Sequence, residues 1–89
     1  MAKNELPLER MPLAELMRRR LGSLLDQLGS HRVPDLYRLV IREVEKVLIE
    51  QALKRAHGSR KGAAEILGIH RNTLGNKMRV LGITKKERP

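Results

Sequence analysis

Apolar residues between positions 13 and 28 recur at spacings of three and four, the spacing of one face of an α-helix. Pro12 suits the first helical turn, which needs no hydrogen bond from its missing N–H. Gly29 suits the end of a helix. The pattern therefore predicts a helix that ends near Gly29. Its apolar positions are Leu13, Leu16, Met17, Leu21, Leu24, Leu25 and Leu28.

A second helix is predicted to start at Pro34 and Asp35 and to reach Gly58, since this stretch has no internal Gly or Pro. At 100° per residue its apolar positions form two groups whose centres lie about 140° apart. The first group is Leu36, Tyr37, Val40, Ile41, Val44, Val47 and Leu48, and the second is Ile49, Ala52, Leu53 and Ala56. We infer that the N-terminal half packs on the first helix, and the C-terminal half on the segment after Gly58.

Two short helices are predicted after Gly58. Ser59 is a suitable N-cap for the first, which ends at Gly68. The second runs from Arg71 to Leu81 and is stopped by Gly82. Their predicted buried residues are Ala63, Ala64, Ile66 and Leu67 in the first helix, and Leu74, Met78 and Leu81 in the second. The predicted fold class is all-α with four helices.

The composition narrows the class of protein. A chain of 89 residues forms one small domain, and 40% hydrophobic residues are too many for a disordered tail. The chain has no cysteine, which excludes disulfides, thiolate metal sites and cysteine catalysis. It also contains no apolar run near the ~20 residues of a membrane span, and its first twelve residues do not resemble a secretory signal. We expect a small, soluble, cytoplasmic protein.

The charge is unevenly distributed. The formal net charge is +9, and residues 58–89 hold eight basic and two acidic side chains, which is +6 of that excess. A folded chain this basic most often binds nucleic acid, so we expect a polyanion to bind to this last third.

Residues 60–79 fit a helix-turn-helix. Ala64 supplies the small residue where two helices cross closely, and Gly68 supplies a turn residue that tolerates positive φ. Ile69 and Leu74 are the apolar anchors after the turn and inside the second helix. An ordinary αα-hairpin would also want a glycine in its turn and remains an alternative. The basic charge on the same segment favours the DNA-binding motif.

The polar side of the predicted helix 71–81 is the candidate DNA-binding surface. Arg can form a fork with guanine, and Asn with adenine. The predicted readers of base edges are Arg71, Asn72 and Asn76. The predicted phosphate contacts are Thr73, Lys77, Arg79 and, at the start of the preceding helix, Lys61. Arg18, Arg19 and Arg20 are interpreted as a solvated face, with a secondary phosphate contact as the alternative.

The sequence offers little support for a catalytic or metal site. The three histidines lie far apart and lack a Cys or carboxylate at ligand spacing, and no serine has an adjacent base. We therefore expect no enzyme, no metal, no cofactor and no small-molecule substrate. A membrane-surface helix and a dimerisation module without DNA specificity remain alternatives. Weak affinity for duplex DNA combined with stable dimers would favour the second.

The sequence resembles the Fis family from about Pro12 to Ile83. This family comprises nucleoid proteins and the C-terminal DNA-binding domains of NtrC-type enhancer-binding activators. The matching stretches are D-L-Y-R-L-V-I-R-E-V-E-K-V-L-I (35–49), A-A-E-I-L-G-I (63–69) and R-N-T-L (71–74). The resemblance implies a four-helix protomer whose first two helices intertwine with those of a partner. Two helix-turn-helix units per dimer would then bind adjacent major grooves and bend the DNA.

The resemblance also implies roles for single residues. Arg71 resembles the family's main base-reading arginine, Thr73 its phosphate-binding threonine, and Lys77 the basic residue one turn later. His70 stands where the family usually has Asn or Ser as a helix cap, which predicts weaker capping. Gly75 and Asn76 stand where the nucleoid proteins carry basic residues, and the N-terminal arm is shorter than in the enteric protein.

The apolar group on the second helix exceeds what one first helix should cover, which favours a homodimer. The predicted interface is Leu21, Leu25, Leu36, Val40, Val44, Val47 and Leu48. The predicted domains are an arm or linker at 1–11, dimerisation helices at 12–57, a helix-turn-helix at 58–83 and a basic tail at 84–89. Met1 favours a free-standing protein on the bacterial nucleoid, and R-N-T-L favours an isolated activator domain.

Overall fold

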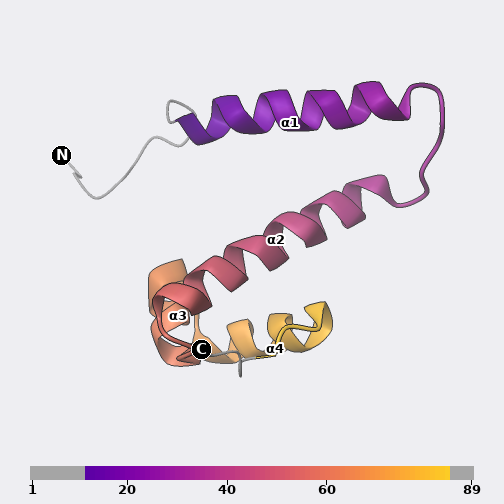
Figure 1. Cartoon of the computed structure of the whole chain (residues 1–89). Helices are drawn as coiled ribbons and strands as arrows, with labels where there is room; N and C mark the ends of the chain where they lie inside the picture. Colours follow the sequence, from indigo (N-terminus) through magenta and orange to yellow (C-terminus); the bar gives the residue numbers. More distant parts are fainter. Residues whose placement is uncertain (1–11, 85–89) are drawn as a thin grey trace. The chain divides into compact units, whose positions relative to one another are not determined.

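The computed structural model describes residues 12–84, and these residues form four α-helices and no strand. The helices are α1 (Pro12–Leu28), α2 (Leu36–Arg55), α3 (Arg60–Leu67) and α4 (Arg71–Leu81). The all-α class and the four predicted helices are confirmed. The chain divides into two units at Pro34 and Asp35, so α1 and the group α2–α4 are described separately (Figure 1). The predicted arm at 1–11 and most of the predicted tail lie outside the described residues.

Helix α1 has no buried residue. Leu16 is 50% exposed and Leu25 56% exposed, although both belong to the predicted apolar stripe. On the polar side the Glu15 carboxylate accepts a hydrogen bond from Arg18 at 3.2 Å and forms an ion pair with Arg19 at 3.5 Å. The apolar stripe of α1 therefore stays partly exposed, and the ion pairs on its polar side are centred on Glu15.

Helix α2 ends three residues before the predicted boundary at Gly58. His57 and Gly58 both have positive φ, at 54° and 85°, and the Gly58 N–H donates to the Leu53 carbonyl at 2.9 Å. This bond closes the helix early, in the manner of a Schellman motif. At the other end Asp35 also has positive φ, at 62°, and its carboxylate accepts a hydrogen bond from Arg38 at 3.2 Å.

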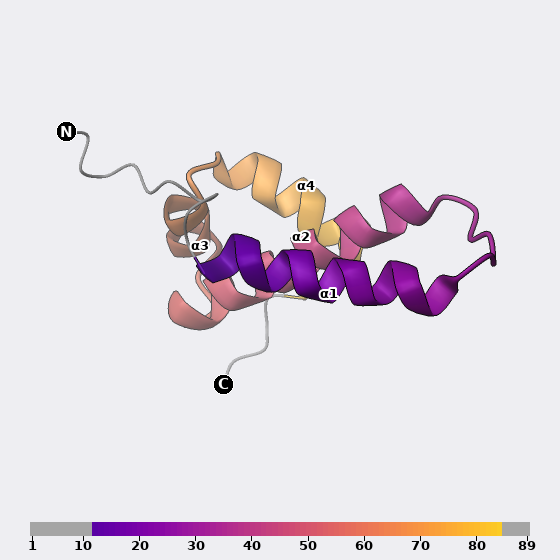
Figure 2. The ribbon, with the colours of Figure 1, turned by 90° about the horizontal axis from the view of Figure 1, so that it is seen from above.

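The two apolar groups of α2 differ in burial in the described structure. Ile49, Ala52 and Leu53 in the C-terminal half are buried. The N-terminal turns extend past α3 and α4 in both ribbon views (Figures 1 and 2). The large apolar side chains of the first group that stay exposed include Ile41, Val44, Val47 and Leu48. The predicted packing of the C-terminal half on the segment after Gly58 is therefore confirmed, while the predicted packing of the N-terminal group on the first helix stays a prediction.

The core joins the C-terminal half of α2 to α3 and α4. Its buried residues are Ile49, Ala52, Leu53, Ala63, Ala64, Leu74, Met78 and Leu81, and Ala56, Leu67, Ile69 and Ile83 pack against it. Ala63 and Leu74 are fully buried, whereas Ile66, which was predicted to be buried, is 54% exposed. Small residues on α3 and large ones on α2 and α4 interdigitate, which is how cores reach high packing density without aromatic side chains. This core holds α4 in place.

Candidate nucleic-acid interface

Helix α3 begins with a satisfied cap and lies close to the end of α2. The Ser59 hydroxyl accepts a hydrogen bond from the Gly62 N–H at 3.0 Å, which confirms Ser59 as the N-cap. A Cβ on Gly62 would lie 3.1 Å from the Ala56 Cβ and 3.3 Å from the Ser59 hydroxyl oxygen. Glycine thus allows a close approach between the two helices that the sequence pattern alone does not reveal.

The turn between α3 and α4 fixes the direction of α4. Gly68 has a φ of 74°, the left-handed conformation that favours glycine. Its N–H donates to the Ala64 carbonyl at 2.8 Å, and the next N–H, that of Ile69, donates to the same carbonyl at 3.1 Å. Ile69 then packs against the core. The left-handed turn predicted at Gly68 and the apolar anchor predicted at Ile69 are borne out, and Ala64 is buried in the core.

Helix α4 is capped at both ends. At its start the His70 Nδ1 accepts a hydrogen bond from the Asn72 N–H at 3.0 Å. This bond requires an imidazole whose Nδ1 carries no proton. His70 therefore caps α4 through a ring nitrogen in place of a side-chain oxygen, and the weaker capping expected of it stays a prediction. At the far end Gly82 has a φ of 72°, and the Ile83 N–H donates to the Met78 carbonyl at 2.9 Å.

One face of α4 is buried and the opposite face is polar and exposed. Leu74, Met78 and Leu81 are at most 7% exposed, as predicted. The predicted DNA-binding residues that lie fully on the exposed surface are Arg71, Asn72, Thr73, Asn76 and Arg79, together with Lys61 on α3. Within this set the Arg79 guanidinium donates to the Asn76 Oδ1 at 3.1 Å. The core therefore presents this row of side chains on a rigid support.

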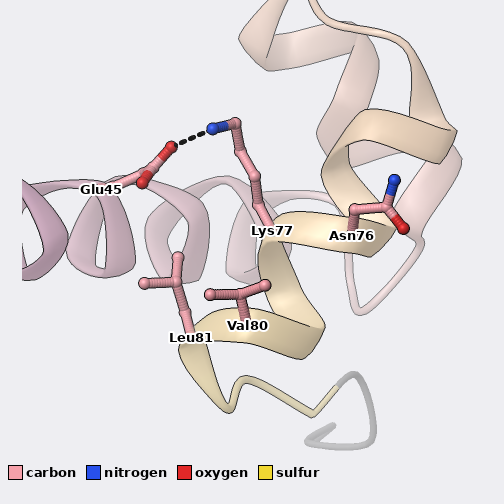
Figure 3. Close-up of a pocket in the computed structure, with 5 residues that line it drawn as sticks. All are labelled: Glu45, Asn76, Lys77, Val80 and Leu81. Atoms are coloured by element: carbon pink, nitrogen blue, oxygen red, sulfur yellow. Dashed lines mark ion pairs between the residues drawn. The ribbon is translucent and has the colours of Figure 1, made fainter.

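Lys77 lies differently from the other predicted contacts. Its Nζ forms an ion pair with the Glu45 carboxylate of α2 at 2.6 Å, and the two side chains are 43% and 31% exposed. Figure 3 shows the pair above a hollow whose other lining residues are Asn76, Val80 and Leu81. In the protein alone the charge of Lys77 is thus partly neutralised. Glu45 was not predicted to belong to the site, because it lies 32 positions away in the sequence.

A second residue missed by the sequence pattern is Arg60, the first residue of α3. Its guanidinium lies against Gly75 of α4. The sequence signal for this contact was the glycine inside an otherwise regular helix, since such a glycine often marks a close approach.

The electrostatics of the segment favour an anionic ligand. Residues 58–84 contain five basic side chains and one acidic side chain, Glu65.

Among residues 12–84 there is no group of histidine and carboxylate side chains that could hold a metal ion. None of the described helices is both long and apolar enough to cross a membrane.

Comparison with known proteins identifies the family of the chain. Residues 40–84 match the family model described as "Bacterial regulatory protein, Fis family". The chain belongs to the Fis family. It is 36% identical to the DNA-binding protein Fis of Aliivibrio fischeri over 72 residues. These 72 residues cover 81% of this chain and 74% of that protein. The corresponding protein of Proteus mirabilis is 35% identical over the same lengths. No solved structure matches the chain significantly.

The Fis-family match includes α3, α4 and most of α2. It therefore covers the core described above and the exposed face of α4, and it confirms the family that the sequence resembles.

Proposed function

We propose that this protein is a non-enzymatic, homodimeric helix-turn-helix protein that binds adjacent major grooves of duplex DNA and bends it. The observation that carries the proposal is the polar face of α4, which projects Arg71, Asn72, Asn76 and Arg79 away from a core that buries the other face. The relatives are DNA-binding proteins by name, which supports the same ligand here. We place the protein in the bacterial cytoplasm, on the nucleoid.

In the proposed complex α4 enters the major groove and α3 lies across the backbone. Arg71, Asn72 and Asn76 read base edges, since their side chains offer the donor and acceptor patterns that guanine and adenine accept. Thr73, Lys77, Arg79 and Lys61 contact phosphates and hold the helix in register. The hydrogen bond between Arg79 and Asn76 preorganises two of these side chains on one face.

The dimer in this proposal covers apolar surface that a single chain leaves in water. Val44, Val47 and Leu48 of α2 are each about half exposed, and so is Leu25 of α1. Burying the exposed half of one such side chain contributes about half of the roughly 1.5–3 kcal/mol for full burial, so several together can hold a dimer. The proposed interface is Leu21, Leu25, Leu36, Val40, Val44, Val47 and Leu48.

Two measurements test the proposal. Sedimentation at micromolar concentration should give about twice the 10.2 kDa of one chain. Titration of a labelled duplex should give binding that weakens steeply with salt, as expected when lysine and arginine displace counterions from phosphates. A well-folded monomer would contradict the dimer. Stable dimers that bind duplex DNA weakly would instead indicate a dimerisation module.

Selection of bound sequences from a random duplex pool identifies the role of the protein. A degenerate pattern with AT-rich flanks would indicate a nucleoid protein, and a strict palindrome would indicate the DNA-binding domain of an enhancer-binding activator. We propose transcription regulation or nucleoid organisation as the role.

A further inference from the structure

Gly75 interrupts the basic and polar row on the exposed face of α4. Residues four apart lie on the same side of a helix, so positions 71, 75 and 79 form one row along α4. Arg71 and Arg79 occupy the two ends of this row, and both are exposed. At the middle position the helix offers no side chain of its own.

The Arg60 side chain of α3 lies over this gap. A Cβ built on Gly75 would be 3.0 Å from one terminal nitrogen of Arg60, and 3.7 Å from both its Cδ and its Cζ. Three atoms along the side chain approach one point, so the guanidinium and its stem lie along the surface of α4 rather than pointing away from it. The glycine allows the guanidinium to lie this close, because a Cβ at this position would force it to move by a few tenths of an ångström.

Arg60 has no ion pair or hydrogen bond through its side chain within residues 12–84. A guanidinium carries five N–H donors that are always charged, and it matches the oxygens of a phosphate in pairs. Arg18, Arg38 and Arg55 donate to a carboxylate or an amide oxygen, whereas Arg20, Arg32, Arg42 and Arg71 have, like Arg60, no such partner among residues 12–84; what distinguishes Arg60 is its contact with Gly75. Arg60 is therefore held in place by packing, with its donors unused.

We propose that Arg60 and Gly75 form one unit that contacts a phosphate of duplex DNA. The unit supplies, from α3, the positive charge that α4 lacks at position 75. This inference rests on the proposed function. The guanidinium belongs to α3 and reaches α4 from the side, so its contact is with the backbone of the DNA and independent of base sequence.

The test compares the wild-type protein with Arg60→Ala, Gly75→Ala and the double variant on a preferred and a scrambled duplex at several salt concentrations. Arg60→Ala should weaken binding to both duplexes by about tenfold, as expected when a hydrogen bond to a charged group is removed. It should also reduce the slope of log K against log salt by about 0.9 for each phosphate that the protein no longer neutralises.

Gly75→Ala is the distinguishing variant. Alanine favours helix more than glycine does, so the melting temperature should stay the same or rise. DNA affinity should nevertheless fall, because the new methyl group shifts the Arg60 guanidinium from its position over α4. In the Arg60→Ala background the same substitution should have no effect on affinity. Arg42→Ala, on the exposed side of α2, is the charge-matched control and should change affinity less than Arg60→Ala.

Each result decides the matter. If Gly75→Ala binds as tightly as the wild type, or weakens binding equally with and without Arg60, Gly75 does not seat the arginine. If Arg60→Ala alters base preference, the contact is with a base and the proposed phosphate contact is wrong. If the wild type itself fails to bind duplex DNA, the proposed function has failed, and that outcome is distinct from the other two.

Discussion

Replacing Glu45 by Gln is expected to strengthen DNA binding, because the Glu45 carboxylate holds a lysine that we assign to a phosphate. The Lys77 Nζ lies 2.6 Å from this carboxylate in the protein alone. A phosphate that approaches Lys77 must either share the ammonium group with Glu45 or displace the carboxylate. In both cases the negative charge of Glu45 opposes the contact.

The magnitude depends on the exposure of the pair. Exposed ion pairs contribute about 0.2–1 kcal/mol, and the partial burial of Lys77 and Glu45 places this pair near the upper end, at about 1 kcal/mol. Removing this competition should raise the affinity of each protomer for DNA about fivefold, and that of a dimer with two such pairs about thirtyfold. The fold should lose at most about 1 kcal/mol of stability.

The measurement is a fluorescence anisotropy titration of a labelled duplex at several salt concentrations, with three further variants. Glu43→Gln is the matched control, since it makes the same change of charge on the same helix at an exposed carboxylate without an ion pair among residues 12–84. Lys77→Ala and the double variant Glu45→Gln/Lys77→Ala complete the cycle.

The expected pattern is a large gain for Glu45→Gln, a small gain for Glu43→Gln, and no gain for Glu45→Gln once Lys77 is absent. Equal gains from the two glutamates would refute the reasoning, because the effect would then be one of net charge alone. A loss of affinity in Glu45→Gln would show that the carboxylate positions Lys77 for DNA rather than competing with it.

Three further predictions concern the dimer, the recognition of DNA and the cap of α4. Val44→Asp should lower dimer stability by several kcal/mol and DNA affinity with it, whereas a stable dimeric variant would show that Val44 faces water in the assembly. Arg71→Ala should cost roughly 1–3 kcal/mol and relax preference at one base position per half-site, measured by comparing preferred and scrambled duplexes. Lys77→Ala should weaken binding to both duplexes alike and lower the slope of log K against log salt by about 1.8 for a dimer. If instead Lys77→Ala changed base preference and Arg71→Ala weakened both duplexes equally, the base-reading and phosphate-binding sides of α4 would be assigned the wrong way round. His70→Ala should cost about 1 kcal/mol in thermal unfolding and His70→Asn much less, while equal losses would show that the ring contributes more than a cap.

The local features of the fold could be predicted because the signals for them are local. Ser59 caps α3 through an N–H three residues away, and directly after Gly68 and Gly82 the N–H groups of Ile69 and Ile83 donate to carbonyls five positions earlier. Apolar periodicity likewise identified the buried face of α4. Such features depend on a few neighbouring residues, so the sequence around them contains the necessary signals.

The end of α2 was harder to predict for a related reason. The absence of Gly and Pro before Gly58 favoured a helix that continues to that residue. His57 instead adopts positive φ, which non-glycine residues rarely do, and the bond from Gly58 to the Leu53 carbonyl closes the helix. The sequence offered a glycine as the stop signal but no sign that the residue before it would share the left-handed conformation.

The contacts that determine the charge on α4 are of a different kind, because they join residues that only the crossing of helices brings together. Arg60 meets Gly75 from α3, and Glu45 meets Lys77 from α2. Positions 75 and 77 are about 200° apart around the helix, so the two contacts act on different sides of α4.

These two contacts change the electrostatics of α4 in opposite senses. Glu45 offsets the charge of Lys77 on one side, and Arg60 adds a charge in the row of Arg71 and Gly75 on the other. The basic residues of α4 alone give a similar total charge, but they do not show on which side of the helix that charge lies. The positive charge thus shifts from the flank of the exposed face that meets α2 at Glu45 to the opposite flank, which carries Arg71, Gly75 and Arg79. The affinity of this helix for DNA is therefore determined as much by its neighbours in space as by its own sequence.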